Sequence, residues 1–134
     1  MQSRELQVDT SGRLVTEITQ SVQTFARESG GDGLLYVFLP HATAGLALME
    51  TGSGSETDLE ELLQRLVPKD DRYEHRHGSV GHGGDHLVPV LIGSSLTLAV
   101  ETGKLVLGTW QSVVIVDPNR ENNRRTVQLR FVEA

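Results

Sequence analysis

Histidine side chains gather in one short part of the chain. Four of the five histidines lie between residues 75 and 86, in a stretch that is otherwise polar, charged and rich in glycine. His75 and His77 are two residues apart, and His82 and His86 are four residues apart. A spacing of two places imidazoles on one face of a strand, a spacing of four does so on a helix, and either pair can bind a metal ion. In a glycine-rich loop neither geometry is assured, so a solvated histidine loop is the alternative.

A separate histidine, His41, directly follows an apolar segment and opens a run of small residues that includes Thr43. If that segment is a strand, the ring emerges at the end of a sheet, where backbone amides are free and a ligand or a metal ion can bind. The alternative is a partly buried ring that is hydrogen-bonded to a backbone carbonyl.

Three carboxylates are candidates for acid and base chemistry or for ligand binding. Glu50 lies between an apolar stretch and a flexible loop and could act as an acid, a base or a ligand. Asp58 lies at the start of a helical pattern, where a carboxylate accepts hydrogen bonds from the first amides of the helix. Asp85 is expected to cap a short helix in the same way. Of the three, Glu50 has the weakest structural explanation.

Arginine and asparagine side chains are concentrated near the end of the chain. Arg120, Arg124 and Arg125 lie among asparagines in a segment between two expected strands. Forked guanidinium donors are suited to phosphate and carboxylate groups. Surface solubility and salt bridges between subunits are the alternatives. Upstream, Trp110 is expected in a core or an interface, and Gln111 could be an uncharged ligand contact.

Hydrophobic periodicity predicts the helices that must position these residues. Apolar residues between positions 15 and 26 form the stripe of an amphipathic helix that Gly30-Gly31 ends. A second helix begins at a capping box, Ser55-Glu56-Thr57-Asp58, and ends before a proline. A long irregular connection over residues 69–84 then precedes a short helix over residues 85–92.

Strand patterns occupy most of the remaining chain. Alternating or continuous apolar residues predict strands over residues 5–10, 34–39, 46–50, 95–100, 106–116 and 125–132. The first of these is expected at the edge of a sheet and the second at the centre of one. The last three are typical of consecutive antiparallel strands. This order of strands and helices predicts one α+β domain over residues 1–134.

Composition and charge exclude several classes of protein. The chain has 134 residues, a length that allows one domain around one core. Twelve basic residues against 18 acidic ones give a net charge of −6, the opposite of what a general nucleic-acid binder needs. Because there is no cysteine, a metal ion could bind only to His, Asp or Glu. No apolar run has the length of a signal peptide or of a membrane span, so a cytoplasmic protein is expected.

Taken in order, these features resemble the YjbQ-like family, whose members are named secondary thiamine-phosphate synthases. The resemblance covers about residues 5–132. It is carried by His41-Ala42-Thr43-Ala44-Gly45-Leu46, Glu50, Asp58, Tyr73-Glu74-His75, Gly81 to Leu87, Gly93 and the block from Gly103 to Gln111. The chain departs from the family pattern at Ala42, Met49 and His82, and its loop over residues 117–125 is longer. Of these departures, His82 could add a ligand.

The resemblance implies a fold, an assembly and a site. The fold would be an α+β domain with a β-sandwich-like core of mostly antiparallel sheets, covered by two or three helices. The assembly would be a homotrimer with sites between or beside its subunits. The site would contain His41, Glu50, Asp58 and His86 as catalytic residues, Thr43, Gln111, Arg124 and Arg125 around the substrate, and His75 and His86 on a divalent metal ion such as zinc or magnesium.

The activity that the family name implies joins a pyrimidine pyrophosphate to a thiazole phosphate and releases pyrophosphate. Such a site must stabilise the departing pyrophosphate and orient a nitrogen nucleophile, tasks that arginine, histidine and a divalent cation can perform. We therefore expect an enzyme that acts on a small phosphorylated molecule. Two alternatives stay open: a non-catalytic trimeric module that binds a metal or an anionic metabolite with the same residues, and a purely structural role for the histidines and arginines.

Overall fold

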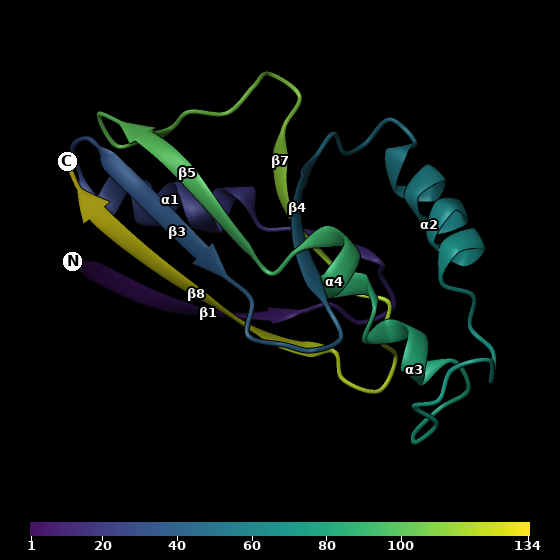
Figure 1. Cartoon of the computed structure of the whole chain (residues 1–134). Coiled ribbons are helices and arrows are strands. Elements are labelled where there is room, and N and C mark those ends of the chain that lie inside the picture. Colours follow the sequence, from purple (N-terminus) through teal and green to yellow (C-terminus); the bar gives the residue numbers. More distant parts are fainter.

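Eight strands form two antiparallel sheets in the computed structural model, which describes residues 1–134 (Figure 1). The larger sheet has the strand order β1 (Gln2–Asp9), β8 (Arg124–Glu133), β3 (Gly33–Phe38), β5 (Ser95–Glu101) and β6 (Lys104–Leu105). The smaller sheet has the order β2 (Val15–Glu17), β7 (Ser112–Val116) and β4 (Gly45–Met49). The expected α+β class is confirmed, with β1 at an edge and β3 at a centre as their patterns predict.

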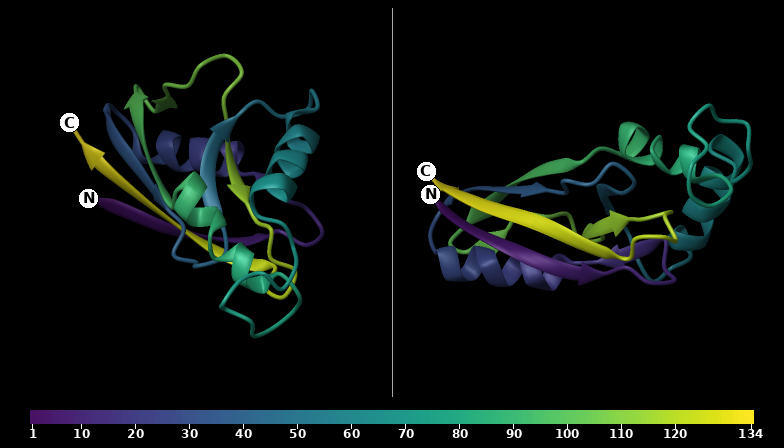
Figure 2. Two further views of the ribbon diagram at one scale, coloured as in Figure 1. Left: turned by 45° about the vertical axis from the view of Figure 1, so that its right-hand side comes forward. Right: turned by 90° about the horizontal axis from the view of Figure 1, so that it is seen from below.

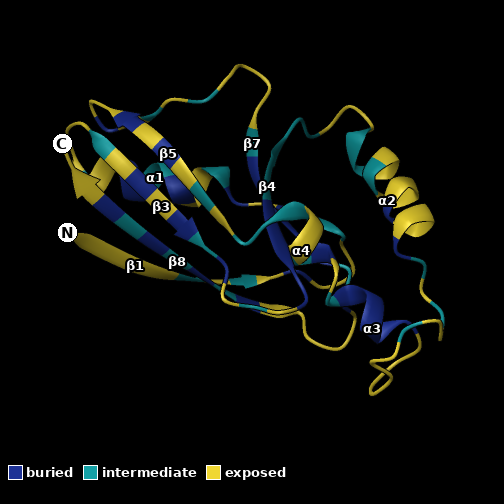
Figure 3. Ribbon diagram, in the orientation of Figure 1, coloured by how far each residue is buried: buried dark blue, intermediate teal, exposed yellow.

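The main core lies between the two sheets and α1 (Thr19–Ser29). Along β8, the buried residues Val127, Leu129 and Phe131 alternate with more exposed ones, as the two-residue period of a strand requires. Figure 3 shows the same alternation along β3 and β5. The helix presents Val22, Phe25 and Ala26 to this core. In Figure 2, α1 lies on one side of the strands and the short helices near residues 82–92 lie on the other.

A second, smaller core covers the outer face of the smaller sheet. Its buried residues are Leu63, Val88, Val114 and Val116. The first two come from α2 (Ser55–Leu66) and α4 (Val88–Ile92) and the last two from β7. The remaining central residues of β7, Val113 and Ile115, belong to the main core. Because β7 is buried on both faces, its sequence is a continuous apolar run rather than an alternating one.

The first helix begins later than its apolar stripe predicts. Val15 and Thr16 belong to β2, where Val15 pairs with Val116 of β7, and α1 starts at Thr19. Pairing with a buried strand outweighs the helical period here because Val15 and Thr16 are β-branched and favour extended backbone. The helix ends at Gly30, as its sequence predicts.

The second helix has no capping box. Its N-cap is Gly54, in the left-handed region with a φ of 101°, and no side chain caps the first turn. Asp58 is already the fourth helical residue, so its carboxylate is too far along the helix to accept the first amides. The Glu56 carboxylate instead accepts a hydrogen bond from the N–H of Gly52, at 2.9 Å, in the loop that precedes the helix. The capping role expected of Asp58 is therefore wrong.

The strand expected over residues 106–116 begins only at Ser112. Ahead of it, Gly108 and Gln111 form a turn in which the Gln111 N–H donates to the Gly108 carbonyl, at 3.1 Å. The Gly108 N–H donates in turn to Oε1 of Gln111, at 2.9 Å. A turn closed by a side-chain amide prevents the chain from extending until it has passed Gln111.

The short helix expected over residues 85–92 is two helices, α3 (His82–Asp85) and α4. Pro89 lies in the first turn of α4, as expected. Asp85 is the last residue of α3, so the expectation that it caps the start of a helix is wrong. No helix of this structure combines the length and the apolar character that a membrane crossing needs.

Candidate metal centre

Three imidazoles converge beside α3. One ring nitrogen from each of His75, His82 and His86 lies within 4.8 Å of the other two, so the group could hold a metal ion. The Nε2 atoms of His82 and His86 are 3.2 Å apart. The ring of His77 lies 4.0 Å, between centroids, from that of His75, but His77 is not part of the converging set. The structure thus places the two sequence-predicted ligands together and adds His82.

Local geometry explains how these rings meet. His82 opens α3 and His86 follows its last residue, so a spacing of four puts both rings on one helix face. His75 arrives from the preceding loop, which packs directly on the α3 backbone. A Cβ at Gly83 would lie 2.3 Å from the His75 carbonyl oxygen, and a Cβ at Gly84 would lie 2.8 Å from the Tyr73 ring. The two glycines therefore make room for the loop that carries the third imidazole.

A carboxylate from the C-terminal loop orients the His82 ring. Oε1 of Glu121 lies 3.1 Å from Nδ1 of His82, and it also accepts the N–H and the hydroxyl of Ser79, at 2.7 and 2.6 Å. These Ser79 hydrogen bonds are the main reason why the pKa of Glu121 is lowered. An Nδ1–H that donates to this carboxylate leaves Nε2 of His82 unprotonated and facing His86. Carboxylates that bind the second nitrogen of a histidine in this way orient metal ligands in proteins.

The surroundings of His75 also favour its neutral form, which is the form that binds metal. The pKa of His75 is lowered, first by loss of hydration and then by the neighbouring histidines. The donor set therefore fits a divalent ion such as zinc, which binds neutral imidazole nitrogen.

Asp85 links the metal centre to two other segments. Its Oδ1 accepts a hydrogen bond from Nζ of Lys69, at 2.5 Å, and its Oδ2 accepts one from Nδ2 of Asn119, at 3.1 Å. Nδ2 of Asn119 also lies 3.3 Å from Nδ1 of His82. Asp85 is almost fully buried, so both of its oxygens need such partners. This pairing, and not helix capping, accounts for the carboxylate at the end of α3.

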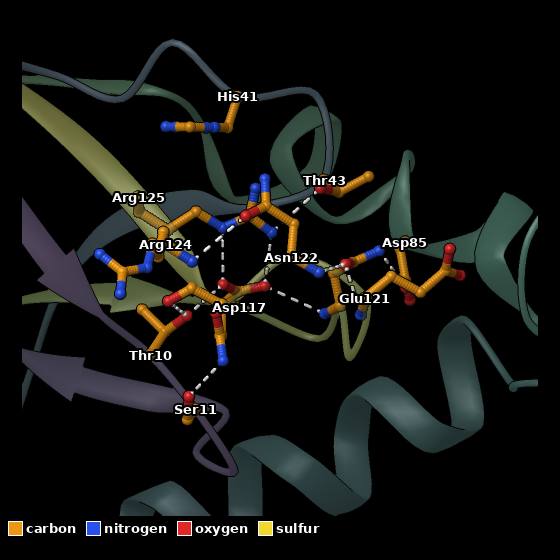
Figure 4. Close-up of polar contacts among 12 residues, drawn as sticks. Thr10, Ser11, His41, Thr43, Asp85, Asp117, Glu121, Asn122, Arg124 and Arg125 are labelled. Carbon is orange, nitrogen blue, oxygen red and sulfur yellow. Dashed lines mark hydrogen bonds and ion pairs between the residues drawn. The ribbon is translucent and has the colours of Figure 1, made fainter.

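Arg125 forms a buried ion pair within the chain (Figure 4). Its Nε and one terminal nitrogen donate to the two oxygens of Asp117, at 2.7 and 2.8 Å. The same terminal nitrogen donates to the Thr43 hydroxyl at 3.0 Å, and Thr10 donates to Asp117 at 2.6 Å. The guanidinium fork and Thr43 are thus engaged in the interior. Arg124, the neighbouring predicted substrate contact, is exposed.

His41 is held by β8. The backbone N–H of Thr126 donates to its Nε2 at 2.9 Å, so this nitrogen accepts and the proton lies on Nδ1. Burial and then the charge of Arg125 lower the pKa of His41, which favours the neutral ring. His41 is not a member of the converging histidine set.

Glu50 and Gln111 lie at the other end of the smaller sheet from Thr43. β4 begins next to Thr43 and ends next to Glu50, and a five-residue strand spans about 15 Å. At the far end Met49 pairs with Ser112, which brings the residues that flank this pair, Glu50 and Gln111, to the same edge. One chain therefore does not bring together all the residues that the resemblance places in the site.

Some residues at this centre were not singled out from the sequence as belonging to it. Glu121 is 39 positions from His82 along the chain, and no local pattern predicts their contact. Lys69 and Asn119 are likewise brought to Asp85 by tertiary structure alone. For His82, the four-residue spacing to His86 was the available signal.

A cavity of about 780 Å³ adjoins the metal centre. It lies between the turn over residues 10–14, the second half of α2 and the loop over residues 117–123. Lys69, Asp85 and Asn119 form part of its wall, and Asn119 contacts both His82 and Asp85. The contents of this cavity would be one layer of side chains away from the imidazoles.

Comparisons with known proteins give consistent matches along the whole chain. A family model described as "UPF0047 protein YjbQ-like" matches residues 4–134. UPF0047 protein Rv2556c of Mycobacterium tuberculosis is 52% identical over 133 residues, 99% of each chain. The crystal structure of hypothetical protein APE1520 from Aeropyrum pernix K1 has a TM-score of 0.88 and 30% identity, and the match covers 100% of both chains. That of the conserved hypothetical protein TT1486 from Thermus thermophilus has a TM-score of 0.84 and 31% identity, covering 96% of this chain and 99% of that one.

Proposed function

The chain belongs to the UPF0047, YjbQ-like family, and from its own site we propose that it is a metal-dependent enzyme acting on a small phosphorylated molecule. The observation that supports this most strongly is the convergence of His75, His82 and His86. Three protein ligands are the number that catalytic zinc sites use, because a further position stays open for a substrate. His75 is exposed, so the group can be approached from solvent.

The specific reaction we propose is of the thiamine-phosphate-synthase type. A ring nitrogen of a thiazole phosphate attacks the methylene carbon of a pyrimidine pyrophosphate, and the bond from that carbon to the pyrophosphate oxygen breaks. A divalent ion held by the three histidines would supply positive charge for the departing pyrophosphate. The chain itself must orient the two rings and exclude water. The cavity beside Asp85 and Asn119 supports this proposal because it has the size of a small-molecule site.

The first test is metal content followed by pyrophosphate release. We expect purified, untagged protein to contain about one divalent ion per chain by mass spectrometry. His75→Ala, His82→Ala and His86→Ala should each lose it, whereas His77→Ala should keep it. Protein with metal should release pyrophosphate from the paired substrates, and His86→Ala should not. A folded His86→Ala variant with unchanged metal content and activity would contradict the proposal.

A non-catalytic module that binds a metal or an anionic metabolite is the second candidate. It is favoured by the positions of Glu50 and Gln111, which lie a strand's length from Thr43, another residue of the expected site. It is also favoured by His41, whose Nε2 is already occupied by the Thr126 amide. This module would retain metal and ligand tightly with no turnover of any pyrophosphate-releasing substrate.

We also propose that the protein assembles as a homotrimer. Trp110 is 72% exposed, so it does not belong to the core. Its exposure favours the alternative of an interface between subunits, where tryptophan is enriched. In such a trimer, one subunit could place the end of its smaller sheet beside the metal centre of another. Glu50 and Gln111 of the first subunit would then lie near the histidines of the second. Sedimentation should show a trimer that Trp110→Ser weakens and Trp110→Phe preserves.

Mixing inactive subunits tests whether the site is shared. Glu50→Gln and His86→Ala should each be inactive alone. When the two are unfolded and refolded together, mixed trimers should regain part of the activity, because some sites then combine an intact Glu50 with an intact His86. No recovery in trimers that are shown to be mixed would mean that Glu50 of one subunit does not complete the site of another.

A further inference from the structure

We propose that the cavity beside the metal centre binds an organic phosphate monoester, with the phosphate near Arg13 and Arg120 and an apolar body on Leu63, Val67 and Val88. This inference rests on the proposed function and deepens it by locating where a phosphorylated substrate binds and which residues hold its two ends. It stands on the cavity's own charges and apolar surface, and it does not require that a metal ion is bound.

The charges of the cavity favour an anion. Two of its acidic residues are buried and already neutralised, since Asp85 pairs with Lys69 and Asp117 pairs with Arg125. Among the other lining residues, Arg13 and Arg120 are basic and Glu60 alone is acidic. Neither arginine forms an ion pair within the chain: a terminal nitrogen of Arg13 donates only to the Asp9 backbone carbonyl, at 2.7 Å. The cavity lining has three basic and three acidic residues, and because Arg125 neutralises Asp117 from outside the lining, one positive charge is left in excess. The net charge of −6 of the whole protein does not predict this local excess.

The apolar part of the wall favours an organic body over a bare phosphate ion. Leu63 and Val67 come from α2 and its end, and Val88 opens α4. All three are largely buried, and Leu63 and Val88 belong to the second core, so they form a fixed apolar floor. Binding sites for small molecules are typically 300–1,000 Å³ with apolar walls and a few placed polar groups, and a volume of about 780 Å³ is within that range.

The position of the cavity connects its ligand to the metal centre. Asp85 and Asn119 line the cavity, and Nδ2 of Asn119 is within 3.3 Å of His82. A phosphate monoester in the cavity would therefore lie one layer of side chains from the imidazoles and would not displace them.

Nuclear magnetic resonance titration of the full chain tests the proposal. The probes are inorganic phosphate, methyl phosphate and phenyl phosphate at constant ionic strength, with phenol as the uncharged control. We expect saturable binding of phenyl phosphate, with amide shifts concentrated in residues 10–14, 60–69 and 117–123. Phenyl phosphate should bind at least tenfold more tightly than inorganic phosphate, and methyl phosphate should lie between them. Equal affinity for the three phosphates would overturn the assignment of an organic body. Binding of phenol as tight as that of phenyl phosphate would overturn the assignment of a phosphate.

Matched variants then locate the phosphate. Arg13→Gln and Arg120→Gln should each weaken phenyl phosphate binding severalfold and the double variant by tenfold or more. Arg65→Gln is the control, because Arg65 lies on α2 and is exposed but does not line the cavity. Binding that survives the double variant, or shifts confined to residues 73–86, would overturn the cavity assignment. Metal content and pyrophosphate release are measured separately. A protein without metal and without pyrophosphate release would refute the proposed function, but it would not contradict phosphate binding in the cavity.

Discussion

Nδ1 of His82 lies 3.1 Å from Oε1 of Glu121, so a loop near the end of the chain orients a ring at the start of α3. The same oxygen accepts two hydrogen bonds from Ser79, which fixes the carboxylate before any ligand binds. A Cβ at Gly78 would lie 2.7 Å from this carboxylate, so the glycine permits the close approach. The histidine loop and the C-terminal loop are thereby joined at a single carboxylate.

Glu121→Gln should weaken metal binding while all three histidines stay in place. The amide retains an oxygen acceptor but loses the negative charge that favours Nδ1–H on His82. Loss of such a partner typically costs 10–100-fold in metal affinity. Competition with a chelating dye measures this, and Glu101→Gln, at an exposed glutamate on β5, is the control. Equal zinc affinity in Glu121→Gln and the unmodified chain would show that the carboxylate does not orient the ligand.

Gly83→Ala should disrupt the metal centre by displacing His75. The added methyl group would lie 2.3 Å from the His75 carbonyl oxygen, so the loop has to move away from α3. Overpacking of this kind costs about 1–3 kcal/mol of the free energy of unfolding, and we expect metal affinity to fall as well. Denaturant unfolding and dye competition measure the two effects. Gly108→Ala is the control, because the atoms nearest to its Cβ would belong to the side chain of Gln111, the nearest at 3.3 Å. A Gly83→Ala protein with normal metal affinity would contradict this account of the loop.

Arg125→Ala should destabilise the chain strongly, whereas Arg124→Ala should not. Removing Arg125 leaves the Asp117 carboxylate buried without its ion-pair partner, which costs about 3–5 kcal/mol. Arg124 is exposed, and surface substitutions usually change stability by less than about 0.5 kcal/mol. Denaturant unfolding at neutral pH measures both. Similar small losses in the two variants would mean that the buried pair contributes little and that Arg125 is free for another role.

The titration of His41 should lower the free energy of unfolding as the pH falls below about 6.5. The pKa of the folded ring is lowered from its ordinary value of 6.5, so the unfolded chain takes up a proton that the folded chain does not. Protons therefore favour unfolding between 6.5 and the lower folded pKa, and this effect is absent above 6.5. His41→Gln keeps an acceptor for the Thr126 amide and does not titrate. Its free energy of unfolding should fall less between about pH 7 and about pH 5 than that of the unmodified chain, and an identical fall would contradict the assignment.

Most elements of this fold follow from local patterns in the sequence. The apolar runs at β3 and β7, the alternation along β8 and the glycines after α1 all act within a few residues, so they can be read along the chain. The concentration of histidines between residues 75 and 86 likewise indicated where a metal could bind. Errors occurred where distant segments compete with a local pattern, as when β7 draws Val15 out of the predicted helix and into β2.

Only the tertiary structure decided which side chains share a site. Hydrogen bonds and ion pairs join residues far apart in sequence, such as Thr43 with Arg125 or His82 with Glu121, and no periodicity records them. Sequence patterns also do not record which residues are kept apart. The register of β4 on β7 places Glu50 beside Gln111 and a strand's length from Thr43. The sequence by itself thus determined the fold class and the candidate ligands. The packing of the loops on α3, through two glycines and one carboxylate, decided that three of the histidines face one another.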